Sequence, residues 1–105
     1  MPANTERRVV VTGLGATTPV GDSAHSTWDA ILAGKSGVRS LERDWVAEYE
    51  LPVTFAATLH TPSADVLTKV EVRRNDPAGQ YALIAARDAW ADSGLAPDDF
   101  DAERL

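Results

Sequence analysis

The segment Arg8–Thr12, which reads R-V-V-V-T, constrains the fold more than any other part of this 105-residue chain. Its three consecutive valines are β-branched, which favours a strand, and its apolar character is continuous rather than alternating. A continuous apolar strand is typical of a parallel sheet that helices cover on both faces. We therefore expect an α/β fold in which this strand has neighbours on both sides.

One helix and a second strand are predicted to follow this segment. The helix begins at Asp22 or Ser23, either of which can cap it, and Gly34 suits the left-handed position after its end. A half-buried strand is predicted over Val53–Thr58, where polar and apolar residues alternate. The stretch between them is expected to be irregular but packed. The apolar stripe of the helix consists of Ala24, Trp28, Ile31 and Leu32.

The clearest helix signal begins at Asp76 and ends at Ser93-Gly94. Asp76 is a natural N-cap, and Pro77 suits the first helical position because its missing N–H has no partner there in any case. One face of this helix is rich in small residues, so we expect a neighbouring segment to approach it closely. That face consists of Ala78, Ala82, Ala85, Ala86, Ala89 and Trp90.

Two predicted strands are too few for the sheet that Arg8–Thr12 requires, because small sheets need three or more strands to be stable. We therefore expect residues 1–105 to form an incomplete α/β unit that depends on further chain.

Composition excludes several classes of function. The chain has no cysteine, which rules out disulfides, thiolate metal sites and a cysteine nucleophile within these residues. A net charge of −6 argues against a nucleic-acid partner. No apolar run approaches the ~18 residues of a membrane span. The polar N-terminus does not resemble a signal peptide, so we expect a cytoplasmic protein with no membrane partner.

Two glycine motifs suggest nucleotide binding but are incomplete. Gly13-Leu14-Gly15 lacks the third glycine of a dinucleotide fingerprint, since Thr18 stands there. Gly34-Lys35-Ser36 resembles the end of a P-loop but follows a helix instead of a strand. We expect structural turns at both and predict no cofactor. His25 and His60 lack partners at ligand spacing, so we predict no metal site and no catalytic residue within this chain.

Three cations stand out in this acidic chain. Lys69, Arg73 and Arg74 are spaced to lie on one side of a helical turn that precedes the capped helix. They form either an exposed stripe that Glu71 and Asp76 partly neutralise or a docking patch for an acidic partner, because a local positive field accelerates encounter with such a partner.

Three blocks of the sequence, in order and in spacing, resemble the elongating β-ketoacyl-acyl-carrier-protein synthases of type II. Together they cover most of the chain, whereas residues 39–72 match only loosely. The sequence departs from the family pattern at Pro77-Ala78, where a basic and an aromatic residue are more usual. The blocks are Arg7–Gly15 with Thr18–Gly21, Ser26–Trp28 with Leu32–Val38, and Arg73–Asp76 with Gln80–Leu83 and Asp92–Leu95.

This resemblance implies a thiolase-like fold of five αβαβα layers, of which residues 1–105 would form an incomplete N-terminal part, and a homodimer. It also implies decarboxylative Claisen condensation of an acyl thioester with malonyl-carrier protein in fatty-acid elongation. The family's cysteine nucleophile would lie beyond residue 105. The resemblance places Lys69, Arg73 and Arg74 where the family contacts its acidic acyl carrier protein.

Three other functions stay open on the sequence. An aromatic-polyketide ketosynthase and a noncatalytic chain-length subunit have similar opening motifs. Outside the family, a nicotinamide-dependent dehydrogenase domain is the alternative that the paired glycines suggest.

Overall fold

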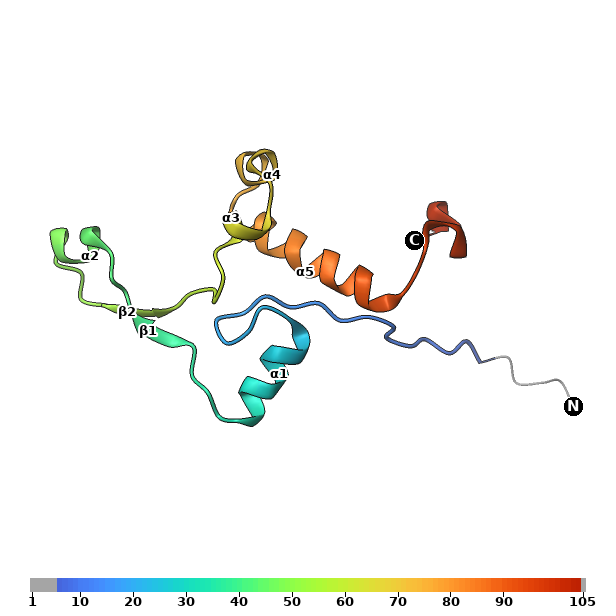
Figure 1. The fold of residues 1–105 in the computed structure, drawn as a ribbon, viewed down its shortest axis with the longest axis horizontal. Helices are drawn as coiled ribbons and strands as arrows, with labels where there is room; N and C mark the ends of the chain where they lie inside the picture. The colour runs from blue at the N-terminus through green and yellow to red at the C-terminus, as the bar shows by residue number, and fades with distance from the viewer. Residues whose placement is uncertain (1–5, 105) are drawn as a thin grey trace, which may run out of the picture.

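The computed structural model describes residues 6–104, which form an extended arrangement of helices with one small hairpin at one side (Figure 1). The Cα radius of gyration is 19.2 Å, whereas a compact domain of this length has about 13 Å. The elements are α1 (Ala24–Leu32), β1 (Val38–Ser40), α2 (Asp44–Glu48), β2 (Phe55–Ala57), α3 (Ser63–Val66), α4 (Lys69–Arg74), α5 (Pro77–Ser93) and the 3-10 turns η1 (Pro97–Asp99) and η2 (Ala102–Arg104).

The prediction of a buried strand at Arg8–Thr12 is wrong for this structure. The segment is extended but has no strand partner among the described residues, and Val9, Val10 and Val11 are 93%, 70% and 79% exposed. A strand is defined by its hydrogen-bonded neighbours, and residues 6–104 supply none for these valines. The expectation that two strands cannot build a parallel sheet around it agrees with this exposure.

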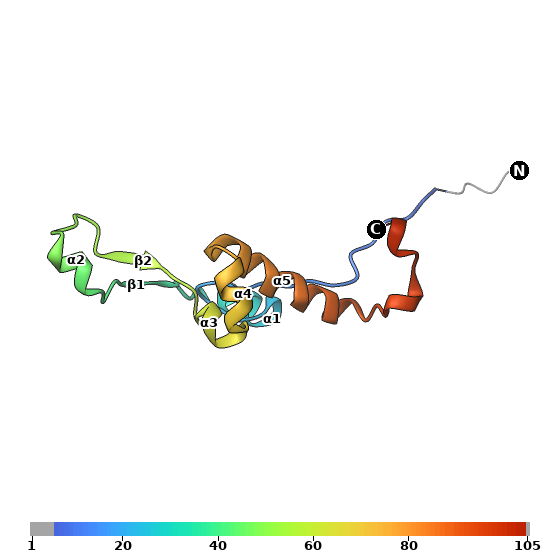
Figure 2. The same cartoon turned by 90° about the horizontal axis from the view of Figure 1, so that it is seen from above.

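The sheet of the described chain is instead a two-stranded antiparallel hairpin. β1 pairs with β2 through Val38–Ala57, Arg39–Ala56 and Ser40–Phe55. The strand predicted at Val53–Thr58 is therefore present over a shorter range, but it is mostly exposed instead of half-buried, because no layer of the described chain covers it. β1 and α2 arise in the stretch that was expected to be irregular. Figure 2 shows the hairpin and α2 projecting away from the other helices.

Both predicted helices are confirmed, because local side chains determine their ends. Ser23 caps α1 in a reciprocal capping box with Ser26, and Gly34 follows the helix at φ 68°. Asp76 caps α5 by accepting from the Gly79 N–H, and Gly94 ends it in the left-handed region. The apolar stripe predicted on α1 stays largely exposed, because no layer of the described chain covers it.

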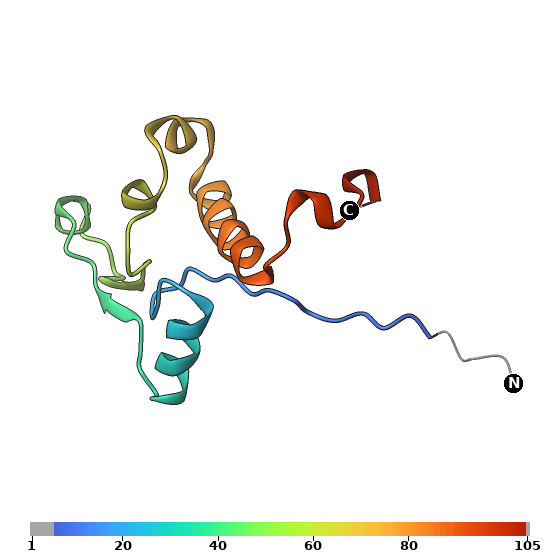
Figure 3. The same ribbon diagram turned by 45° about the vertical axis from the view of Figure 1, so that its right-hand side comes forward.

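The small-residue face of α5 does receive a close neighbour, as the sequence predicts. The extended segment around Gly13 and Gly15 crosses α5, as the views in Figures 1 and 3 show. A Cβ on Gly13 would overlap the Ala89 carbonyl oxygen, and one on Gly15 would overlap that of Ala85. Glycine is thus required here for backbone contact.

The buried core is small. Among the described residues it consists of Ala30, Val46, Leu67 and Ile84, with Gln80 as a buried polar side chain. Ile84 and Gln80 lie on α5, and Leu67 joins α3 to α4, so the best-packed region is the α3–α4–α5 cluster. No helix within residues 6–104 combines the length and the apolar character needed to cross a membrane.

Candidate functional site

The three predicted cations lie on a separate short helix, α4, at the N-terminal end of α5 (Figures 1 and 3). Thr68 begins α4 in a capping box with Glu71. The Glu71 N–H donates to Thr68 Oγ1 at 3.3 Å, and the Thr68 N–H donates to Glu71 Oε2 at 2.9 Å. This reciprocal pair satisfies two N–H groups that a helix start otherwise leaves without partners. The sequence T-K-V-E therefore determines where the cationic helix begins.

Lys69, Arg73 and Arg74 are all exposed. With 3.6 residues per turn they span an arc of about 140° around the helix axis. None of the three forms an ion pair within residues 6–104. The two arginines also lie in the last turn of α4, where cations interact favourably with the helix dipole. Such a stripe gives a local positive field on an otherwise acidic chain.

The two acids that the neutralised-stripe alternative invoked are engaged elsewhere. Glu71 forms an ion pair with Arg87 of α5, and Asp76 caps α5. The Arg87 guanidinium, followed by the backbone N–H of Thr68, lowers the pKa of Glu71 to about 2. The same pairing raises the pKa of Arg87. The structure thus disfavours direct neutralisation of the stripe by these acids.

A buried glutamine fastens the C-terminal end of α4 to α5. Gln80 is 8% exposed, and its Nε2 donates to the carbonyl oxygens of Val72 and Asn75 at 3.1 and 2.9 Å. Its Oε1 accepts from Ser63 Oγ at 2.6 Å. Carbonyl groups at a helix end lack intrahelical partners, so Gln80 supplies the donors that α4 needs. One side chain therefore links α3, α4 and α5.

Sequence reasoning missed both Gln80 and the Glu71–Arg87 pair. Gln80 did carry a signal, because it stands four residues before Ile84 and so shares the buried face of α5. A polar residue at a buried helical position predicts a hydrogen-bonded partner. Arg87 carried no comparable signal, since its partner lies sixteen residues earlier on another helix.

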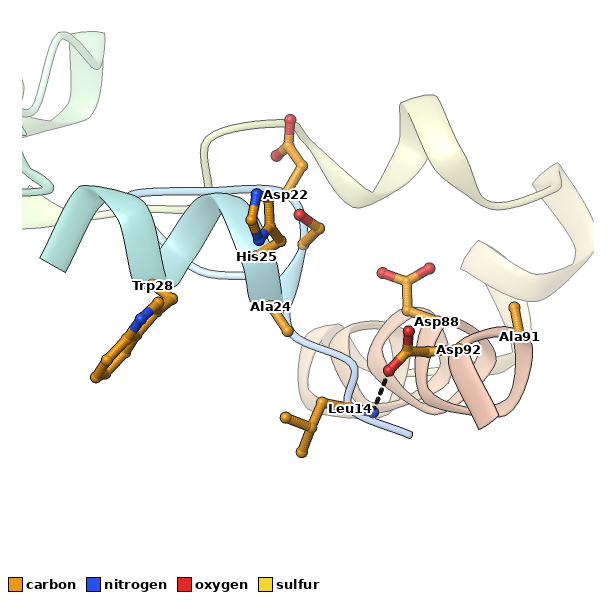
Figure 4. A pocket seen from close by; sticks show the side chains of 9 residues that line it. Leu14, Asp22, Ala24, His25, Trp28, Asp88, Ala91 and Asp92 are labelled. Carbon is orange, nitrogen blue, oxygen red and sulfur yellow. Dashed lines mark hydrogen bonds between the residues drawn. The ribbon is translucent and has the colours of Figure 1, made fainter. Parts of the chain in front are cut away.

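A second feature is an open groove of about 730 Å³ between the start of α1 and the later turns of α5 (Figure 4). Asp88 and Asp92 line it from α5, and Trp28 and His25 line it from α1. Asp92 accepts from the Leu14 N–H at 2.9 Å, so this carboxylate anchors the N-terminal segment. The groove is a junction between segments, and Asp92 already has a structural role there.

His25 and His60, for which the sequence predicts no metal-binding or catalytic role, each lie beside one carboxylate. His25 Nε2 lies 3.3 Å from Asp29 Oδ2, and His60 Nδ1 lies 3.4 Å from Asp22 Oδ2. Asp22 also accepts from Thr61 Oγ1 at 2.8 Å, which is the main cause of its lowered pKa. No three acid, histidine or cysteine side chains of residues 6–104 converge as metal ligands.

The residues of both glycine motifs interact with the backbone of this chain. Gly13 and Gly15 are covered by α5, so a pyrophosphate could not approach this loop as a dinucleotide fingerprint requires. Ser36 Oγ, in the P-loop-like segment, accepts from the Val38 N–H at the start of β1. The cationic helix is therefore the best candidate for a functional surface.

Comparison with known protein families identifies the class of protein to which this chain belongs. Residues 6–105 match the family model described as the N-terminal domain of β-ketoacyl synthases. The chain belongs to this family, which confirms the resemblance read from its three sequence blocks. The mixed helix and strand content agrees with a partial α/β unit.

Individual proteins of this family with a similar sequence carry a more specific name. The chain is 40% identical over 101 residues to 3-oxoacyl-[acyl-carrier-protein] synthase 2 of Coxiella burnetii, covering 95% of this chain and 24% of the relative. It is 37% identical over 100 residues to the protein of the same name from Staphylococcus aureus strain N315, covering 94% and 24%. The Vibrio cholerae protein of that name is 35% identical over 101 residues, covering 95% and 24%. The chain thus spans about a quarter of these relatives.

Proposed function

We propose that this chain forms part of a 3-oxoacyl-acyl-carrier-protein synthase that elongates fatty acids. The identity to proteins of that name supports the proposal, as does the family match across residues 6–105. In the proposed reaction, a cysteine thiolate takes the acyl group from its thioester. Malonyl-carrier protein loses carbon dioxide, and the enolate carbon then attacks the acyl-enzyme carbonyl and releases the thiolate.

The 105 residues themselves are proposed to be noncatalytic. They contain no cysteine, so they cannot supply the nucleophile. By the resemblance, the cysteine, two enolate-stabilising histidines and the oxyanion-binding N–H groups lie outside residues 1–105. His25 and His60 match none of these.

The complete protein is proposed to have the five-layer thiolase-like fold, to form a homodimer and to work in the cytoplasm without a bound cofactor. The exposed valines of residues 9–11 and the exposed apolar stripe of α1 support the fold proposal. Burying such surfaces is the main favourable term in folding, so both predict further layers of protein against them.

The contribution of this chain to function is proposed to be docking of the acidic acyl carrier protein on α4. The observation that carries this proposal is the exposure of Lys69, Arg73 and Arg74 on one short helix with no ion-pair partner in the described chain. Exposed complementary charges mainly raise the association rate constant and make it sensitive to salt.

Two measurements on the complete protein test these proposals. The first incubates it with acyl- and malonyl-carrier protein and follows 3-oxoacyl product by mass spectrometry. Condensation is expected. Decarboxylation without condensation would instead indicate a chain-length subunit, and saturable NAD(P)H binding would favour the dehydrogenase alternative. A polyketide ketosynthase would give a poly-β-keto product rather than a single extension.

The second measurement compares carrier-protein association for Arg73→Glu/Arg74→Glu with a charge-matched control, Lys35→Glu/Arg43→Glu. Lys35 and Arg43 are exposed, and their side chains make no hydrogen bond or ion pair within residues 6–104. The α4 variant should associate at least about tenfold more slowly at low salt, with a flattened salt dependence. Equal rates for the two variants would refute docking on α4.

A further inference from the structure

Glu71 is the sole acid of α4, and its position makes it a potential competitor for the docking cations. At 100° per residue it lies ~160° from Lys69 and Arg73 but only ~60° from Arg74. Residues three apart on a helix are neighbours, and an acid and a base at this spacing attract one another. Without another partner, Glu71 would be placed to pair with Arg74 and to cancel one charge of the stripe.

The structure directs both carboxylate oxygens of Glu71 elsewhere. Oε1 accepts from Arg87 Nη2 of α5, and Oε2 accepts from the Thr68 N–H at 2.9 Å. The Glu71 side chain is 23% exposed, whereas that of Arg87 is 54% exposed. The acid is thus turned toward α5 and shielded, while Arg74 remains exposed without an ion pair in the described chain.

We infer that Arg87 is a positioning residue for the carrier-protein surface, because it holds Glu71 away from Arg74 and so keeps all three cations available to the partner. This inference rests on the proposed docking role of α4. Arg87 itself lies on α5, beyond the cationic stripe, and need not touch the partner. Arg87 acts through Glu71. An arginine suits this role because its planar guanidinium is always charged and presents several donors to a carboxylate.

The test measures association of the complete enzyme with acyl carrier protein by stopped flow at low salt. Arg87→Gln should slow association at least about twofold, as much as Arg74→Gln, because a unit charge some 10 Å from an opposite charge in water changes a rate by about that factor. Adding Glu71→Gln to Arg87→Gln should restore the wild-type rate, because the competing carboxylate is gone. Glutamine at this position keeps the capping box.

Controls separate this mechanism from simpler ones. Arg43→Gln makes the same change in net charge at the remote start of α2, and it should slow association less than Arg87→Gln. Arg87→Lys keeps a cation beside Glu71 and should associate at nearly the wild-type rate. Because Arg87 is more than half exposed, these variants should fold, which thermal unfolding checks.

Each outcome has a defined meaning. A double variant as slow as Arg87→Gln would show that the ion pair fixes the angle of α4, and it would overturn the inference. If Arg43→Gln slows association as much as Arg87→Gln, the loss of net charge alone explains the slower association, and the inference is also overturned. If Arg73→Glu/Arg74→Glu leaves association unchanged, the docking proposal itself fails.

Discussion

Replacing Gln80 with methionine in the complete protein should loosen α4 without disturbing the start of α5. The change keeps the length and apolar stem of the side chain but removes its amide. Three hydrogen bonds are lost, namely those to Val72 O, Asn75 O and Ser63 Oγ. At about 1 kcal/mol net for each bond, local opening of α4 should become easier by about 2–4 kcal/mol.

Amide hydrogen exchange measures this local opening directly. The N–H of Val72 donates to Thr68 O at 3.0 Å and that of Asn75 donates to Glu71 O at 3.1 Å, so both report on α4. A loss near 3 kcal/mol should accelerate their exchange roughly hundredfold, since each 1.4 kcal/mol is a factor of about ten. The amide of Gly79, which the Asp76 cap protects, should change far less.

Two further variants define the cause. Gln80→Glu retains an acceptor for Ser63 but sets a carboxylate against two carbonyl oxygens, so at neutral pH it should loosen α4 more than methionine does. Tyr81→Phe, at the neighbouring exposed position, should leave exchange unchanged. Unaltered protection of Val72 and Asn75 in Gln80→Met would refute the view that Gln80 fastens α4 to α5.

Three other predictions follow from the same contacts. Because the pKa of Glu71 is lowered from 4.5 to about 2, its pairing should stabilise the complete protein fully above pH about 4.5 and progressively less as the pH falls toward 2; comparing unfolding midpoints of wild type and Glu71→Gln across this range checks the sign, and parallel curves would contradict it. Gly15→Ala should destabilise the protein by about 1–3 kcal/mol, because its Cβ would overlap α5. Gly34→Ala has open space around it and should destabilise the protein by about 1–2 kcal/mol from its positive φ alone. Thermal unfolding measures both losses, and crystal structures separate the two causes, because only Gly15→Ala should shift α5. The isolated 105-residue chain should lack a cooperative thermal transition, since its core is so small; a sharp calorimetric transition would count against this.

The sequence predicted those parts of the fold that local chemistry determines. Ser23 and Asp76 begin helices because their side chains accept from nearby N–H groups, and Gly34 and Gly94 follow helix ends because their φ of 68° suits glycine. The cationic helix was likewise predicted from spacing alone. Each of these features depends on residues within about one helical turn.

Features that depend on distant partners could not be predicted in the same way. The valines of Arg8–Thr12 have strong strand propensity, but a strand also needs neighbours, and residues 6–104 provide none. The β1–β2 hairpin pairs segments that are separated by α2, whose residues gave no tight-turn signal. The Glu71–Arg87 pair depends on how α4 turns back onto α5 at Asn75-Asp76.

The two kinds of exposed surface on this chain therefore differ in what they imply. The exposed valines and the apolar stripe of α1 are surfaces that water disfavours, so their exposure should end wherever further protein covers them. The surface of α4 is charged. Gln80 donates to carbonyl oxygens at its C-terminal end, and its acid, Glu71, accepts from the Thr68 N–H and from Arg87. Within residues 6–104, the main contacts of α4 come from the stretch between α3 and α5. We therefore expect α4 to keep this form in the complete protein, which makes it the part of the chain best suited to meet a partner.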